Sequence, residues 1–128
     1  MSRFLLTWGV VWFLLALVFG LYLAIAGGSP VSVEARGSHS HLGLLALASI
    51  IIGGVVYPRL GLARSTRELA ETLWCVGFLQ PIGLFVKLRS SGLGVSMAAV
   101  GSFCLIFSVL IYTLGIFNYQ DPLAKIEK

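Results

Sequence analysis

The chain has 128 residues, of which 58% are hydrophobic and 11% are charged, and its mean hydropathy is +0.96. Because soluble domains carry about 25% charged residues, this composition excludes an ordinary water-exposed surface and predicts a single membrane domain. The net charge of +4 does not indicate nucleic-acid binding, since the nine Lys and Arg residues form no basic face.

Four apolar stretches separated by short polar ones predict an all-α bundle of four transmembrane helices. Crossing the hydrocarbon core takes about 20 residues. The third stretch is short at its apolar limits, Thr72–Val86, and needs a longer range to cross. The first is longer than the apolar region of a signal peptide, so we expect a retained helix. The expected spans are residues 4–26, 39–57, 69–88 and 93–117.

The second expected span begins with the two histidines of the chain, His39 and His41. Ionisable residues in membrane helices are uncommon and indicate a functional site, and neutral imidazole is a common ligand of iron and other transition metals. On a helix, residues two positions apart point about 200° apart, so the two imidazoles cannot be neighbouring ligands of one metal.

The helix face that carries His39 is rich in small residues, which let another helix or a flat macrocycle approach closely. The face that carries His41 is bulkier. If one imidazole binds a cofactor, this pattern favours His39 and leaves His41 as the alternative. The residues aligned with His39 are Gly43, Ala46, Ile50, Gly53 and Tyr57.

The third expected span contains Gln80 and Pro81 near its middle. A proline there removes a helical hydrogen bond, and the amide of Gln80 needs a polar partner in hydrocarbon. We therefore expect Gln80 to face the protein interior, either to bond another helix or to contact a substrate or cofactor. Before this span, Ser65 with Glu68 fits a capping box.

The fourth expected span carries a small-xxx-small pattern, which is typical of a helix-packing surface. The pattern serves either the bundle or a homo-oligomer. We interpret Cys75 and Cys104 as small buried hydrophobes, because their number and spacing suggest neither a zinc site nor a disulfide. The small residues of the pattern are Gly94, Ala98, Gly101 and Ser102.

The basic residues predict the orientation, since Lys and Arg are enriched in cytoplasmic loops. Three of the nine fall on one side of the four-span arrangement, at Arg36, Lys87 and Arg89. We therefore expect both termini in the cytoplasm, with the chain in the inner (plasma) membrane of a prokaryote. The other six are Arg3, Arg59, Arg64, Arg67, Lys125 and Lys128.

No soluble catalytic motif is present, and the five acidic residues are expected in loops or tails. Imidazole with a few neutral polar groups suits a cofactor that brings its own reactivity. Haem b fits this set: His39 would bind the iron, Arg36 would pair with a propionate, and Gly43 and Ala46 would leave room. Two other interpretations stay open. His39 and His41 are interfacial residues without a cofactor, or the His-x-His element binds copper or zinc.

The stretch from Glu34 to Gly43, followed by an apolar helix and Pro58-Arg-Leu-Gly-Leu62, resembles helix 2 of the styrene oxide isomerase and hydroxylaminobenzene mutase group. These are small four-helix membrane proteins. The resemblance implies haem b held by one histidine, with ferric iron acting as a Lewis acid on an epoxide oxygen, and a homotrimer. The family's Arg-x-His-Ser falls best on His39, with one extra residue after Arg36. Counting back from Pro58 leaves His41 as the alternative.

The family's substrate-facing Asn is replaced here by Leu45 or Ala46. The stretch His-Ser-His-Leu-Gly-Leu-Leu is also similar to an element of small membrane proteins akin to haem–copper oxidase subunit I, which again implies haem or copper. We expect an isomerase of a small apolar epoxide or hydroxylamine taken from the lipid bilayer, with Gln80 or Tyr57 orienting the substrate. The alternatives are a haem-carrying electron-transfer or sensing subunit and a cofactor-free structural subunit of a membrane complex.

Overall fold

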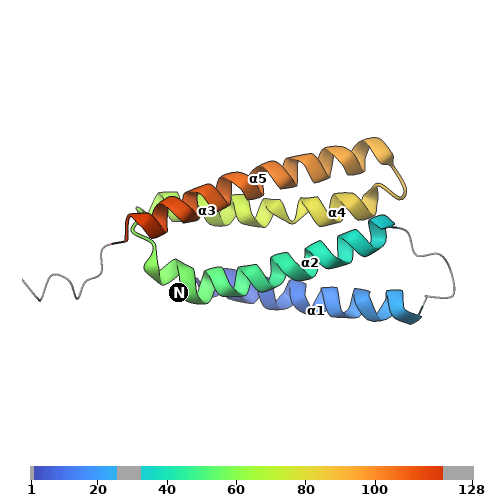
Figure 1. The fold of residues 1–128 in the computed structure, drawn as a ribbon, viewed down its shortest axis with the longest axis horizontal. Coiled ribbons are helices and arrows are strands. Elements are labelled where there is room, and N and C mark those ends of the chain that lie inside the picture. Colours follow the sequence, from blue (N-terminus) through green and yellow to red (C-terminus); the bar gives the residue numbers. More distant parts are fainter. Residues whose placement is uncertain (1, 26–32, 120–128) are drawn as a thin grey trace, which may run out of the picture.

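The computed structural model describes residues 2–25 and 33–119, and these form a bundle of helices that run along one common direction (Figure 1). The described ranges contain no strand. Four segments are long and apolar enough to cross a membrane: residues 3–25, 33–59, 64–86 and 91–117. This confirms the predicted all-α, four-span bundle. Its helices are α1 (Arg3–Ile25), α2 (Val33–Ile51), α3 (Arg64–Gly77), α4 (Leu79–Val86) and α5 (Ser91–Phe117), and α2 continues into a π-helical turn η1 (Ile52–Val56) and a 3-10 turn η2 (Tyr57–Arg59).

The helices pack as two antiparallel pairs. Helix α1 lies along α2, and α5 lies along α3 and α4, while α2 joins the pairs by its contact with α4 (Figure 1). Glycines bring α5 close to α4: a Cβ added to Gly101 would lie 2.3 Å from the backbone N of Gln80, and one added to Gly94 would lie 2.4 Å from the N of Lys87. Gly94 and Gly101 therefore serve packing inside the bundle.

The third span is interrupted, as the proline predicts. Helix α3 ends at Gly77 and α4 begins at Leu79, with Phe78 between them. The missing N–H of Pro81 would have bonded the carbonyl of Gly77, so the interruption falls one turn before the proline. The N–H of Phe78 instead donates to the carbonyl of Cys75 at 3.2 Å.

Polar side chains connect the helices where the interior offers no water. The indole Nε1 of Trp74 donates to Ser49 Oγ at 2.7 Å, which ties α3 to α2. Ser108 Oγ donates to the carbonyl of Ala70 at 2.8 Å, which ties α5 to α3. Such interhelical bonds contribute about 0.6 kcal/mol each on average in membrane proteins, so they set the register more than they supply stability.

Two sequence-based expectations on element boundaries were wrong. Helix α2 begins at Val33 rather than His39, so both histidines lie inside the helix. The capping box does not form, because α3 begins at Arg64 with no side-chain cap and Glu68 pairs with Arg64 at 2.7 Å.

The acidic residues of the described ranges were expected in loops, but they lie in helices: Glu34 in α2, and Glu68 and Glu71 in α3. Glu71 faces the bundle and accepts a hydrogen bond from the hydroxyl of Ser2. Ala26, Lys125 and Lys128, which entered the expected spans and charge pattern, lie outside the described residues.

Candidate functional site

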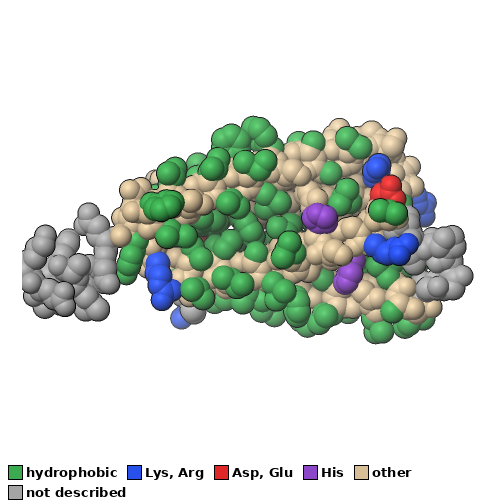
Figure 2. Space-filling model, in the orientation of Figure 1, with side chains coloured by type: hydrophobic (Ala, Val, Ile, Leu, Met, Phe, Trp, Pro, Cys, Tyr) green, Lys and Arg blue, Asp and Glu red, His purple; other side chains and the backbone are tan. Residues whose placement is uncertain are grey.

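Both histidines lie on one face of the bundle, toward the end at which α2 begins (Figure 2). Lys, Arg and acidic side chains gather at the same end, beyond the histidines (Figure 2). One ion pair there joins two helices, with Lys87 Nζ 3.4 Å from Glu34 Oε1. The imidazoles therefore lie between a charged rim and the long apolar part of the bundle.

The imidazole of His39 packs directly on helix α1. A Cβ added to Gly20 would lie 2.6 Å from Cε1 of His39, so only glycine lets the ring lie where it does. The ring of Phe19 contacts it edge-on, with centroids 6.0 Å apart. Nδ1 of His39 is buried and has no hydrogen-bond partner among the described residues. An unsatisfied nitrogen in apolar surroundings is costly, and His39 shares this feature with Trp8 Nε1, Arg67 Nε, Gln80 Oε1 and the Tyr112 hydroxyl.

His39 also lines a groove of about 350 Å³ between α1 and α2. Small residues, Ala16 and Gly43, leave room at its floor, and His39 and Ser40 are its polar members. The groove is thus an apolar surface that carries one imidazole. The bulky apolar residues that line it are Phe13, Leu17, Leu44 and Leu47.

His41 is held differently. Its side chain is exposed, and Nδ1 lies 2.7 Å from the carbonyl oxygen of Gly37. Because a carbonyl can only accept, Nδ1 carries the proton and Nε2 carries the lone pair. Metal-binding histidines commonly have this arrangement. Both histidines lie inside helix α2, so their side chains point in different directions. They are therefore not placed to hold one metal ion together.

The residues predicted to surround the cofactor are only partly brought together. Gly43 lines the groove with His39, and Arg36 lies one turn before His39 with its carbonyl accepting from Ser40 Oγ at 3.0 Å. Ala46 does not line the groove. It is fully buried against α1, where its carbonyl oxygen would lie 2.8 Å from a Cβ on Gly9.

The two residues predicted to orient a substrate lie elsewhere. Gln80 has a buried Oε1, as expected for an inward-facing amide, but it lines a different groove, between α4 and α5. Tyr57 lies in η2, and at about 1.5 Å per residue it is about 27 Å along the helix from His39. Its ring instead packs under the guanidinium of Arg67, 5.5 Å from the centroid.

The sequence-based reasoning missed the contribution of α1. Gly20 and Phe19 position His39, yet nothing in the local pattern of α1 distinguishes them, because the signal is a contact with another helix. It also missed Ser38, one residue before His39, whose Oγ donates to the carbonyl of Pro81 at 2.7 Å. This bond fixes the beginning of α2 against the interrupted third span.

Within residues 2–25 and 33–119, no group of three or more His, Cys, Asp or Glu side chains is placed to hold a metal ion. A haem needs only one or two axial ligands from the protein, because the porphyrin nitrogens supply the rest. One imidazole on an apolar groove with a small-residue floor fits that requirement.

No known protein family, characterised protein or solved structure matches this chain. The resemblance to the isomerase and mutase group therefore remains a prediction from the sequence.

Proposed function

We propose that this chain is an integral membrane haem b protein in which His39 is the axial ligand, and that it isomerises a small apolar epoxide or hydroxylamine taken from the bilayer. The observation that carries the proposal is the position of His39. Among the described residues that line the apolar α1–α2 groove, its imidazole is the one ionisable group, and Gly20 lets the ring pack directly on α1.

Four residues in or near the groove have a role in this proposal. His39 would hold the cofactor, and Arg36, one turn earlier on the exposed rim, would pair with a carboxylate of the macrocycle. Leu44 and Leu47 would bind the apolar ring edge and exclude water. When bound, ferric haem would supply a Lewis acid that polarises an epoxide or hydroxylamine oxygen.

None of the described residues that line the groove carries a carboxylate, and neither Gln80 nor Tyr57 reaches it. Lewis-acid isomerisation needs no general acid or base from the protein, so the proposed activity is compatible with this lining. The same lining supports a second candidate, a haem-carrying electron-transfer or sensing subunit, because nothing in the groove is specific to a substrate.

The absorption spectrum of the purified protein, expressed with ample haem supply, tests the proposal. We expect a Soret band that is lost in His39→Ala and retained in His41→Ala. His41 is the matched control because it lies on the same helix and also carries an imidazole with an available Nε2. The opposite pattern would identify His41 as the axial ligand. The absence of a Soret band from the wild-type protein would overturn the haem proposal.

Turnover of styrene oxide, followed by gas chromatography, then separates an enzyme from a carrier. We expect conversion to the isomeric aldehyde by the wild-type protein and none by His39→Ala. Unchanged epoxide in the presence of bound haem would contradict the isomerase activity and favour the haem-carrying subunit.

Gly20→Ala is expected to weaken haem binding although neither histidine is substituted. The new methyl group would lie 2.6 Å from Cε1 of His39, so the imidazole must move away from α1. Displacing a supporting contact of a metal ligand costs about tenfold in affinity. A haem titration of the apoprotein measures the effect. Gly37→Ala is the control, because the nearest atom, Leu84 Cδ1, is 4.0 Å from its added Cβ. Equal affinities for both variants would contradict the assigned position.

The proposal includes a sidedness and an assembly. Arg59, Arg64 and Arg67 lie at the end of the bundle away from the histidines, which places the histidines toward the outer face if that basic end is cytoplasmic. We propose that both termini are cytoplasmic in a prokaryotic inner membrane, and that the chain forms a homotrimer, as the resemblance implies.

A further inference from the structure

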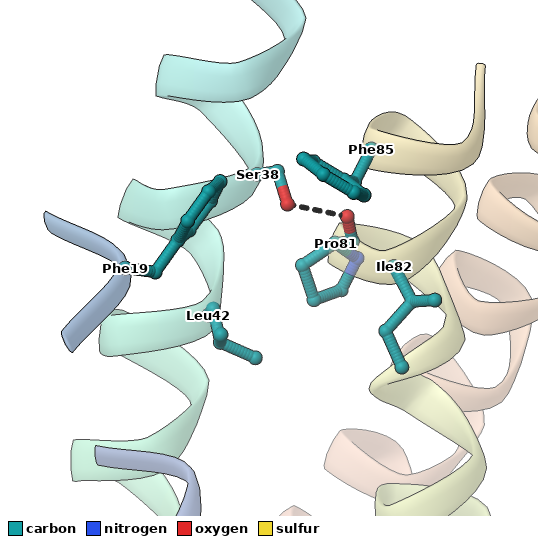
Figure 3. A pocket seen from close by; sticks show the side chains of 6 residues that line it. All are labelled: Phe19, Ser38, Leu42, Pro81, Ile82 and Phe85. Carbon is teal, nitrogen blue, oxygen red and sulfur yellow. Dashed lines mark hydrogen bonds between the residues drawn. The ribbon is translucent and has the colours of Figure 1, made fainter. Parts of the chain in front are cut away.

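A second cavity lies on the other side of Phe19 from His39. It has a volume of about 200 Å³ and is lined by residues of α1, α2 and α4. Figure 3 shows Phe19 and Leu42 on one side, Ile82 and Phe85 on the other, and the Ser38–Pro81 hydrogen bond between them. This cavity shares no lining residue with the groove that contains His39.

The cavity is apolar and closed at its inner end. Ser38, Leu42 and Pro81 are buried, and the hydroxyl hydrogen of Ser38 is used by the carbonyl of Pro81 at 2.7 Å. The outer end is formed by Ile82, which is half-buried, and by Phe85, which is 48% exposed. The cavity therefore opens at the bundle surface within the spanning segments.

Phe19 separates the cavity from the imidazole. Its ring meets the ring of Phe85 edge-to-face, with centroids 5.5 Å apart at 88°, and meets the ring of His39 with centroids 6.0 Å apart at 72°. A molecule in the cavity would thus lie one aromatic ring away from His39 and would not contact it.

We propose that this cavity binds a compact, uncharged apolar molecule about the size of one six-membered ring, which enters from the bilayer. An apolar cavity of about 150 Å³ lined by Leu, Ile and Phe stays free of water and binds benzene, and this one is slightly larger with a similar lining. A lipid acyl chain continues along the bundle surface from its headgroup, whereas the inner wall of the cavity consists of the buried residues Ser38, Leu42 and Pro81. The site needs no cofactor. The proposal goes beyond the proposed function, because it adds a binding site for apolar molecules next to the His39 groove.

Photolabelling of the full chain in phosphatidylcholine nanodiscs tests the site. The probe is trifluoromethyl phenyl diazirine, and the labelled positions are mapped by mass spectrometry. We expect saturable labelling of the segments that contain Phe19 and Phe85, and loss of that labelling with excess benzene. Hexadecane, which mimics an acyl chain, should not compete. Labelling that does not saturate, or that hexadecane abolishes, would overturn the proposal.

Two variants of one helix sharpen the test. Ile82→Phe adds a ring inside the cavity and is expected to weaken saturable labelling about tenfold, because overfilling a packed site costs more than 1 kcal/mol. Leu79→Phe is the control. Leu79 is half-buried on the same helix but does not line the cavity, so this variant should be labelled as the wild-type protein is. Equal labelling of both variants would place the probe elsewhere.

A third variant keeps the test possible if Ile82→Phe does not fold. Leu42→Ala enlarges the cavity and is expected to gain saturable labelling by a naphthyl diazirine that the wild-type protein excludes. No gain in a folded Leu42→Ala protein would contradict the site. The outcome is independent of haem: a protein without a Soret band that still shows saturable labelling loses the proposed function and keeps this site.

Discussion

Gly101→Ala is expected to lower the free energy of unfolding by about 3 kcal/mol, the upper range for overpacking a well-packed interior. The added Cβ would lie 2.3 Å from the backbone N of Gln80 and 2.9 Å from its Cα. These are main-chain atoms of α4, so no side-chain rotation relieves the clash and the two helices must separate. Unfolding by SDS titration in mixed micelles measures the change.

Gly92→Ala is the matched control for this effect, because it lies on the same helix and its added Cβ would meet nothing within 4 Å. Alanine is intrinsically the better helix former by about 1 kcal/mol, so this control should be unchanged or slightly more stable. A loss of stability in both variants, or in neither, would contradict the close approach of α5 to α4.

Trp74→Ala is expected to be nearly as destabilising, with a loss of about 3 kcal/mol for the removal of a buried indole. Trp74 is 4% exposed, its ring lies 6.4 Å from that of Tyr112, and its Nε1 donates to Ser49. The lost energy comes mainly from packing and the cavity left behind, because lipid tails are as apolar as the protein interior. The same SDS titration measures it.

Two comparisons separate the contributions of the ring and its nitrogen. Ser49→Ala removes the acceptor of Trp74 Nε1, together with the bond that Ser49 Oγ donates to the carbonyl of Leu45 at 2.8 Å, and should cost about 1 kcal/mol. Phe117→Ala removes an aromatic ring that is 81% exposed and should change stability by less than about 0.5 kcal/mol. If Trp74→Ala were no worse than Phe117→Ala, α3 would not be packed in the bundle as described.

These stability effects bear on the site, because no single helix builds it. His39 is supplied by α2, its support by Gly20 and Phe19 of α1, and the cavity beyond Phe19 is closed by Pro81 of α4. The Ser38–Pro81 bond joins the two helix pairs at this level. Loosening the packing at Gly101 is therefore expected to disturb the site from a distance.

The sequence by itself determined the membrane class, the four spans and the interruption near Pro81. These follow from hydropathy and from a missing N–H, which are local properties that no tertiary contact can reverse. The divergence of His39 and His41 was also determined, since two positions on one helix have a fixed angle between them. The beginning of α2 was not, because its first turns are polar and contact another helix: Glu34 Oε1 lies 3.4 Å from Nζ of Lys87, directly after α4.

Only the tertiary structure decided which faces meet. Ala46 and Gly43 share a helix face in the sequence pattern, yet α1 covers the first and leaves the second in the groove. Gln80 faces α5 rather than His39, and Gly101 serves the bundle rather than another chain. In an apolar environment hydropathy does not distinguish a lipid-facing surface from a helix-facing one, so these choices depend on the shape and close packing of partners distant in the chain.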